Sequence, residues 1–306
     1  MGADKPLFTV FTPTLNRAHT LHRVYDSLRA QTFKDFEWII VDTGSEDGTD
    51  RLVKSWQDVE QAFPIDYYCL PGKGKHHAFN HAAAVAQGYL LVNIDSDDAC
   101  VPEALERINY HWFNIAPEIR NGFAGIISLC SYPDGEIVGK RLPQPLLDIT
   151  FAEAVYIYRL HQEMLYVLRT DVLREYPFPE CDGCRICPEG VHWHNIGQKY
   201  KTRFVDEPLR IYYTDQSSLC RAPRRQFSFP RRCAHKRKLE EQIAWFWKDP
   251  LNFLKSGINY SRYSFHLGVG IKKQSADLKS MSSIMTWFIT LPVGLAFYIY
   301  DRWTDR

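Results

Sequence analysis

The sequence predicts an α/β fold with a mostly parallel, doubly wound sheet, followed by a helical C-terminal part. Three observations lead to this prediction. Short apolar runs alternate with helical patterns through the first two hundred residues, polar clusters follow the ends of those runs, and the composition changes after Thr214. The chain has 306 residues, of which 45% are hydrophobic and 24% charged, so it is neither disordered nor collagen-like.

The expected elements of the first part alternate in order along the chain. The expected strands cover residues 8–11, 36–41, 65–70 and 89–94, and the helices between them cover residues 21–30, a stretch from Asp50, and residues 75–87. Further strands are expected at 125–129, 164–168, 203–205 and 209–213, with a helix at 191–200. Strand–helix alternation is typical of parallel sheets, whose ligands bind at the carboxyl ends of the strands. Polar clusters at 13–16, 42–45 and 95–98 fall at such ends.

The composition divides the chain into two predicted domains, residues 1–215 and residues 216–306. Residues 221–238 carry many arginines and lysines and no acid. Residues 239–263 are aromatic and read as a helix, and residues 284–300 are apolar and almost uncharged.

Net charge and cysteine content indicate which partners and which cellular compartment to expect. The formal net charge is +1, so charge alone indicates no partner, and we expect no nucleic-acid ligand. The polar start at residues 1–6 lacks an apolar leader pattern. With eight cysteines, this predicts a reducing cytoplasmic setting with free thiols.

Three aspartates within residues 95–98 (Asp-Ser-Asp-Asp) follow an expected strand. Clustered carboxylates repel one another unless positive charge lies between them. A divalent cation with oxygen ligands supplies that charge, and a pyrophosphate can complete its shell. The alternative is a solvated loop or a helix cap. Asp42 also ends a strand, where it can accept hydrogen bonds from a base or a ribose, or can cap a turn.

Four segments taken together resemble family 2 glycosyltransferases of the GT-A fold. They are residues 11–18, residues 31–37, the segment from Asp42, and residues 88–98 with Pro102. The order and spacing of these segments make the resemblance specific, and it extends over residues 7–213. It implies a GT-A doubly wound mixed sheet flanked by helices and an inverting transfer from a nucleotide-diphosphate sugar, with a UDP-sugar favoured.

The resemblance places five residues around the base and the phosphates of the donor. Pro13 and Thr14 would cradle the nucleotide base with their backbone, and Asp42 would contact the base. Lys75 and Asn80 would lie on a helix that faces the donor. Lys75 would reach the pyrophosphate, with a solvated lysine as the alternative.

The resemblance also assigns the aspartates after the fourth strand. Asp95 would contact the ribose, and Asp97 would hold Mn²⁺ or Mg²⁺ beside the pyrophosphate. The metal would stabilise the departing nucleotide diphosphate as a Lewis acid.

An inverting transfer also needs a general base for the acceptor hydroxyl. The resemblance assigns this role to Glu189, expected at the start of a helix, with a plain helix-end charge as the alternative. His192 and His194 are the second choice as bases or metal ligands, and packing is their commoner role.

The chain departs from the family pattern in ways that bear on function. Thr43 stands where a second acid is common, and Gly190 follows Glu189 where an acid is usual. The Gln-x-x-Arg-Trp motif of processive synthases is absent from the sequence, so we expect transfer of a single sugar. The departures leave an alternative, a nucleotide-sugar-binding scaffold at the membrane with impaired catalysis. A nucleotidyltransferase is disfavoured because no Gly-rich, basic phosphate loop follows the first strand.

The basic and apolar stretches of the C-terminal part indicate membrane association. The basic stretch at 221–238 is either a lid over the pyrophosphate, a site for anionic lipid headgroups, or a solvated connector. Residues 281–300 approach the ~20 residues that span a bilayer, and Pro292 and Gly294 suggest a kink or a re-entrant hairpin. The alternative is a buried core helix or an oligomer contact. We expect peripheral or monotopic association at the cytoplasmic face of a membrane, with a glycan or a lipid-linked polysaccharide precursor as acceptor.

Cys181, Cys184 and Cys187 form a CxxCxxC run. Thiolates at this spacing bind zinc or an iron–sulfur cluster when a fourth ligand is present. His192, His194 and Cys220 are candidates for that ligand, and free thiols are the alternative.

Overall fold

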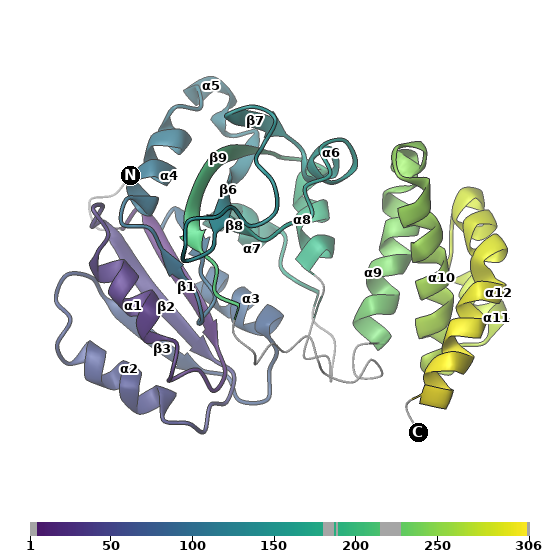
Figure 1. Cartoon of the computed structure of the whole chain (residues 1–306), viewed down its shortest axis with the longest axis horizontal. Coiled ribbons are helices and arrows are strands. Elements are labelled where there is room, and N and C mark those ends of the chain that lie inside the picture. Colours follow the sequence, from purple (N-terminus) through teal and green to yellow (C-terminus); the bar gives the residue numbers. More distant parts are fainter. Residues whose placement is uncertain (1–4, 180–186, 188, 215–227, 305–306) are drawn as a thin grey trace. The chain divides into compact units, whose positions relative to one another are not determined.

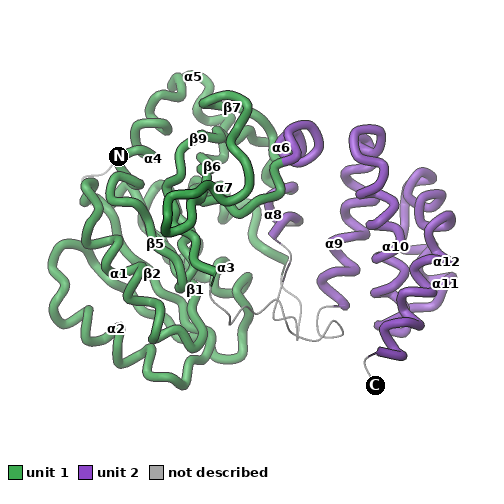
Figure 2. The backbone as a smooth tube through the Cα atoms, in the orientation of Figure 1, with its two compact units in different colours: residues 1–151, 160–180, 195–217 green, residues 152–159, 181–194, 218–306 purple. Residues whose placement is uncertain are grey.

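The structure is a computed structural model that describes residues 5–179, 187, 189–214 and 228–304. The chain forms two compact units (Figure 2). Unit 1 comprises residues 1–151, 160–180 and 195–217, and unit 2 comprises residues 152–159, 181–194 and 218–306.

The units are not divided by the single cut between residues 215 and 216 that the composition predicts. Two earlier segments, 152–159 and 181–194, belong to unit 2, and the side chains of the first pack on its helices. The ring of Tyr156 stacks with those of Trp245 and Phe253, and Arg159 pairs with Asp249 at 2.6 Å. Such contacts join residues about ninety positions apart, which composition does not reveal.

Unit 1 is built on one mixed sheet (Figure 1). Its strands are β1 (Phe8–Thr14), β2 (Phe36–Asp42), β3 (Ile65–Cys69), β4 (Leu90–Asn93), β5 (Ala99–Cys100), β6 (Phe123–Ser131), β7 (Leu146–Ile149), β8 (Met164–Arg169) and β9 (Lys201–Ile211). Within the described residues the order is β3-β2-β1-β4-β8-β6-β9-β5, and β7 also pairs with β9. The first four strands are parallel, and β8 runs antiparallel to β4 and β6. The predicted α/β mixed sheet is confirmed.

The centre of the sheet is a topological switch point. From β1 the chain proceeds through β2 to β3 on one side and then returns to β4 on the other side. Every residue of β1, β2 and β4 is buried, as expected of parallel strands covered on both faces. Ligands of doubly wound folds bind beyond the carboxyl ends of the strands at such a point.

Helices connect the strands of unit 1. They are α1 (His22–Arg29), α2 (Thr49–Gln57), α3 (Lys75–Val85), α4 (Ala104–Phe113), α5 (Pro117–Arg120) and α7 (Thr170–Glu175); α6 (Phe151–Tyr156) and α8 (Glu189–Gly197) include residues of both units. The amphipathic stretch at 21–30 forms α1, whose apolar face buries Val24, Tyr25 and Leu28.

Several residues of the family-like segments have structural roles. Glu37 on β2 is buried and accepts hydrogen bonds from the Thr9 hydroxyl and the backbone N–H of Gln87 and Gly88. A Cβ atom at Gly88 would lie 2.3 Å from the Thr9 nitrogen. These contacts join β1, β2 and the start of β4, so they hold the centre of the sheet in register.

Strand β9 differs from the prediction of two strands at 203–205 and 209–213. It is one strand, Lys201–Ile211, and its register with β6 shifts between Ser128 and Cys130, opposite Pro208. Pro208 has no N–H to donate, so the ladder is interrupted by an irregularity rather than ended. The continuous strand carries Arg210 to the edge of the sheet where β4 ends.

Unit 2 is helical over most of its described length. Its main elements are α9 (Ser228–Glu241), the 3₁₀ helix η3 (Ile243–Lys248), α10 (Pro250–His266), α11 (Ile271–Ala276) and α12 (Met281–Thr304). The segment 239–263 is helical, as expected, but it is divided among the end of α9, η3 and α10. Pro250 begins α10 at its first turn, where proline is favoured, and η3 precedes it. The hairpin expected at Pro292 is wrong, because α12 runs through this residue and packs along α10.

In the described part of the basic stretch, residues 228–238, two basic side chains make contacts within unit 2. Arg232 is buried on α9, where it donates hydrogen bonds to Ser264 and Tyr260 and pairs with Asp277 at 2.6 Å. The Lys238 ammonium lies 5.4 Å from the ring centroid of Phe253. These two side chains therefore make contacts within unit 2, and the lid, headgroup and connector alternatives for the whole stretch stay predictions. Residues 221–227 lie outside the described residues.

Candidate donor site

The ends of β1 and β2 bring the first group of predicted donor residues together. Thr14 on β1 pairs in register with Asp42 on β2, and Pro13 precedes it. The carboxylate of Asp42 is buried and accepts hydrogen bonds from the backbone N–H of Gly44 and Ser45 at 2.9 and 2.7 Å. Its second oxygen accepts from the Tyr67 hydroxyl at 2.7 Å. Asp42 therefore also organises the turn after β2.

The second group follows β4. The Asp95 carboxylate lies between two cations, the Lys75 ammonium at 2.8 Å and the Arg210 guanidinium at 3.0 Å. Lys75 begins α3, whereas Arg210 comes from β9. The same guanidinium donates to the buried Asp98 carboxylate, with its Nε 2.6 Å from Oδ2. Asp98 also accepts the backbone N–H of Tyr213 at 3.0 Å.

The pKa values follow from these contacts. Burial alone raises the pKa of Asp95, but Lys75 and Arg210 lower it further, so its pKa lies well below the ordinary value. Burial raises the pKa of Asp98 to about 6 against the opposing pull of Arg210. Asp95 and Asp98 are both ionised at neutral pH, with Arg210 between them.

Two of the three aspartates receive positive charge without a metal, and the expected metal at Asp97 stays a prediction. Arg210 and Lys75 supply positive charge to Asp95 and Asp98 from the chain itself. Among the described residues no group of three or more His, Cys, Asp or Glu side chains is placed to hold a metal ion.

Asp97 has a different environment from its neighbours. Its side chain is 29% exposed, and its carboxylate lies 3.7 Å from the Arg17 guanidinium, longer than a hydrogen bond. The Arg23 side chain, which stacks on the ring of Tyr213, donates to the Asp97 backbone carbonyl at 2.9 Å. The Thr20 hydroxyl donates to the carbonyl of Ser96 at 3.0 Å. The start of α1 thus holds the loop while leaving the Asp97 carboxylate accessible.

Asp97 fits a divalent cation as one oxygen ligand. Magnesium is usually bound by one or two carboxylates together with substrate phosphates and water, rather than by a complete protein cage. The partly exposed Asp97 carboxylate offers one such oxygen ligand, with the Arg17 guanidinium 3.7 Å away.

Asn80 lies one and a half turns into α3. Its side-chain amide donates to the Phe178 carbonyl at 2.9 Å and accepts from the Phe178 N–H at 2.8 Å. These bonds tie α3 to the segment after α7. The donor-binding role of Asn80 stays a prediction.

The predicted catalytic residues belong to unit 2. Glu189 is the first residue of α8 and is partly exposed. His192 and His194 are buried, and burial lowers their pKa values to about 3 and about 4. Histidines with such low pKa values are weak bases at neutral pH, which counts against them as the general base.

The cysteine run is described only at Cys187. Burial raises the pKa of its thiol to about 11, so the thiol is protonated at neutral pH. Cys181, Cys184 and Cys220 lie outside the described residues.

Sequence reasoning missed Arg210, and it did not single out Arg23. A lone arginine between apolar residues in a strand pattern, Leu209-Arg210-Ile211, is the signal that could have identified Arg210. A buried arginine needs an acidic partner, and the aspartates after β4 were already candidates.

Comparison with known proteins agrees with the geometry. Residues 9–114 match the family model described as glycosyl transferase family 2. The chondroitin synthase of Pasteurella multocida (strain Pm70) is 33% identical over 101 residues, which cover 33% of this chain and 10% of that protein. A putative teichuronic acid biosynthesis glycosyltransferase, TuaG of Bacillus subtilis (strain 168), is 31% identical over 103 residues, 34% of this chain and 40% of that protein. The chain therefore matches well under two thirds of the length of these curated relatives.

Solved structures share the fold over nearly the whole chain. S. aureus TarS 1-349 in complex with UDP-GlcNAc matches with a TM-score of 0.59 at 15% identity, covering 95% of this chain and 92% of that chain. The mannosyltransferase PcManGT from Pyrobaculum calidifontis, in complex with GDP-Man and Mn²⁺, matches with a TM-score of 0.54 at 15% identity, covering 99% and 89%. At these identities the likeness shows the fold. Residues 9–114 thus match the family 2 glycosyltransferases, and the chain as a whole shares the fold of solved glycosyltransferases.

Proposed function

We propose that this protein is an inverting glycosyltransferase that moves one sugar from a nucleotide-diphosphate sugar to a hydroxyl acceptor. One observation supports the proposal: Asp42 ends β2 and the Asp95–Asp97 loop, paired with Lys75, follows β4, so these residues lie at the carboxyl ends of strands on either side of the switch point. This is where doubly wound folds bind nucleotides.

A UDP-sugar is the favoured donor. TarS is described in complex with UDP-GlcNAc, whereas PcManGT is described in complex with GDP-Man, so the shared fold accommodates either base. The names of the curated relatives refer to chondroitin and teichuronic acid. They support a glycan or a lipid-linked polysaccharide precursor as the acceptor.

The residues of unit 1 would act on the leaving group. Asp97 would contribute one carboxylate oxygen to Mn²⁺ or Mg²⁺, which when bound stabilises negative charge on the departing nucleotide diphosphate. Lys75 would place an ammonium beside the same phosphates, and its contact with Asp95 orients it. Asp95, ionised at neutral pH, would accept hydrogen bonds from the ribose hydroxyls.

Glu189 would be the general base. Its carboxylate would accept the proton of the acceptor hydroxyl as that oxygen attacks the anomeric carbon. Its partial exposure supports this role, and the low pKa values of His192 and His194 leave it as the stronger candidate.

The alternative, a catalytically impaired nucleotide-sugar-binding scaffold at the membrane, rests on Thr43 and Gly190 standing where the family commonly has acids. It predicts donor binding without turnover. The enzyme is favoured because Asp95, Asp97 and Glu189 are all present.

Calorimetric titration of the purified full chain with UDP, GDP and dTDP, each with and without Mn²⁺, tests the donor site. We expect metal-dependent binding of one nucleotide, UDP in the first instance. Folded protein that binds none of the three would refute the donor-site assignment. Binding without turnover over a broad panel of acceptors would favour the scaffold.

A further inference from the structure

One face of α12 is apolar and exposed. Its side chains are 38% to 75% exposed and recur along one side of the helix: Met281, Met285, Phe288, Ile289, Val293, Leu295, Ile299, Tyr300 and Trp303. The sequence has no charged residue from Met281 to Tyr300. Scattered apolar side chains are normal on a protein surface, but a continuous apolar face of this length indicates a binding surface.

The opposite face of α12 is held against α10. A Cβ atom at Gly294 would lie 2.6 Å from the Ile258 carbonyl oxygen, so the two backbones are in close contact. Near the end of the helix the buried Asp301 carboxylate pairs with Arg262 and with His266. These contacts prevent α12 from rotating to bury its apolar face within unit 2.

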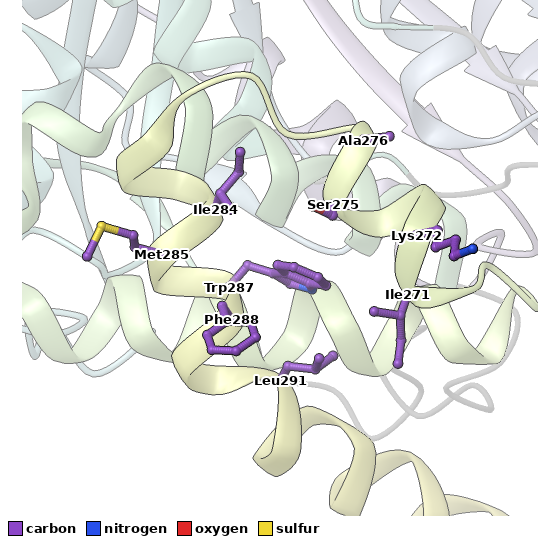
Figure 3. A pocket seen from close by; sticks show the side chains of 9 residues that line it. All are labelled: Ile271, Lys272, Ser275, Ala276, Ile284, Met285, Trp287, Phe288 and Leu291. Atoms are coloured by element: carbon purple, nitrogen blue, oxygen red, sulfur yellow. The ribbon is translucent and has the colours of Figure 1, made fainter.

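A groove of about 630 Å³ continues the apolar face toward α11 (Figure 3). Met285, Phe288 and Leu291 line it from α12, and Ile271 and Lys272 line it from α11. The groove is mostly apolar, with Lys272 and Ser275 as its polar lining residues, and its volume lies within the range of small-molecule sites. Its chemistry suits an acyl chain beneath an anionic headgroup.

Basic side chains flank the apolar face. Lys272, Lys273, Lys279 and Arg302 are exposed, whereas Asp277 and Asp301, the two acids that the structure describes between residues 271 and 304, are already paired. Asp277 pairs with Arg232 and Lys273, and Asp301 is buried with Arg262 and His266. The resulting positive charge is complementary to anionic lipid headgroups, and Trp303 and Tyr300 suit the membrane interface.

We propose that unit 2 docks on an anionic phospholipid bilayer through this surface, the apolar face of α12 with the α11–α12 groove, hereafter the membrane face. The inference goes beyond the proposed function, which assigns no membrane location, and it names the residues that would bind the bilayer. The helix lies in the plane of the interface, with its apolar face toward the acyl chains and an acyl chain in the groove.

The polar face of α12 argues against a spanning orientation. The 24-residue helix is long and apolar enough to cross a bilayer, with a mean hydropathy of 1.5 over its best window. However, Ser283, Thr290 and Asp301 on its inner face are buried against the rest of unit 2. Taking this face across a bilayer would carry α10 with it, including Lys255 and Arg262, into hydrocarbon.

Vesicle flotation of the full chain tests the membrane face. The probes are vesicles of phosphatidylcholine alone and of phosphatidylcholine with phosphatidylglycerol. The matched variants are Ile289→Glu on the membrane face, where the side chain is 66% exposed, and Ile119→Glu on α5, where it is 55% exposed. We expect wild type and Ile119→Glu to float with the anionic vesicles, and Ile289→Glu to bind them at least about tenfold more weakly.

Two outcomes would overturn the proposal. The first is equal flotation of Ile289→Glu and wild type. The second is failure of wild type to float while light scattering shows a dimer that Ile289→Glu dissociates, which would make this face a contact between two copies of the chain. Nucleotide titration of Ile289→Glu separates the two proposals, since the donor site lies in unit 1. If Ile289→Glu binds nucleotide as wild type does, the proposed function is unaffected by the result of the flotation experiment.

Discussion

The three aspartates after β4 have three different environments despite their adjacency. Asp98 is buried and forms an ion pair with Arg210. Asp95 forms ion pairs with both Lys75 and Arg210. Asp97 is partly exposed, and its carboxylate lies 3.7 Å from the Arg17 guanidinium. Of these three carboxylates, only that of Asp97 is both partly exposed and held by a single long ion pair, so it is the one best able to bind a metal ion. Asp98 is a structural partner of Arg210, and Arg210 positions Asp95.

Replacing Arg210 with methionine should strongly destabilise unit 1. The change leaves the buried Asp98 without a counter-charge, and loss of one partner of a buried pair costs about 3–5 kcal/mol. Urea unfolding measures the loss of unfolding free energy. The matched control is Arg141→Met, whose pair with Asp206 at 3.0 Å is 58% exposed on the arginine side and should contribute about 0–1 kcal/mol. Adding Asp98→Asn to Arg210→Met should restore part of the stability; no restoration would show that the Asp98 charge is not the cause.

Asp97→Asn and Glu189→Gln should separate donor binding from proton transfer. Asp97→Asn should lose the metal-dependent part of nucleotide binding and the turnover with it. Glu189→Gln should keep nucleotide binding and lose roughly 10²–10⁴-fold in kcat, the usual contribution of a general base. Glu118→Gln, on the exposed surface of α5, is the control for charge removal. Retained metal-dependent activity in Asp97→Asn would contradict the assignment of Asp97.

At the scale of the elements, the pairing of α10 with α12 depends on two glycines. A Cβ atom at Gly257 would lie 2.3 Å from the Thr290 hydroxyl oxygen, and one at Gly294 would lie 2.6 Å from the Ile258 carbonyl oxygen. Small residues at these points allow the two helices to approach closely.

Gly294→Ala should lower the unfolding free energy by about 1–3 kcal/mol, the usual cost of overpacking, even though alanine favours helix. Gly270→Ala in the same unit is the control, because a Cβ atom there meets nothing within 4 Å. Circular dichroism during urea unfolding compares the two. Equal stability of both variants would mean that α10 and α12 can separate without loss.

At the scale of the whole molecule, the stability of the protein should fall as the pH drops below 6.5. Burial lowers the pKa of His192 to about 3, and burial together with Arg237 and Lys238 lowers that of His194 to about 4. Both are neutral in the folded protein, whereas the unfolded chain takes up protons below its ordinary histidine pKa of about 6.5. Their contribution is complete above pH 6.5 and is lost toward pH 4, at about 1.4 kcal/mol per pH unit for each histidine.

Urea midpoints between pH 7.5 and pH 5 measure this dependence. In the variant His192→Phe, the unfolding free energy should decline less steeply as the pH falls, because one titrating group is removed while the aromatic ring stays. An unchanged decline in that variant would assign the pH dependence to other groups.

Much of the architecture follows from local pattern. Fully apolar runs form the buried strands β1, β2 and β4, and polar residues directly after them mark the ligand edge of the sheet. The same local reasoning placed Asp42 and Asp95 at that edge. It also identified the apolar character of α12, because composition is a property of the segment itself.

Contacts between distant residues decided the rest. Arg210 meets Asp95 across 115 positions of sequence, so the charge expected from a metal comes partly from a strand that the local pattern did not connect to the site. Likewise α12 continues through Pro292 because it packs along α10, and the α6 segment belongs to unit 2 through Tyr156. The sequence by itself determined the first four strands, the polar edge and the resemblance to family 2 glycosyltransferases, since these depend on neighbouring residues. Only the tertiary structure decided which charges neutralise one another and which helix face stays exposed, since those depend on residues that folding brings together.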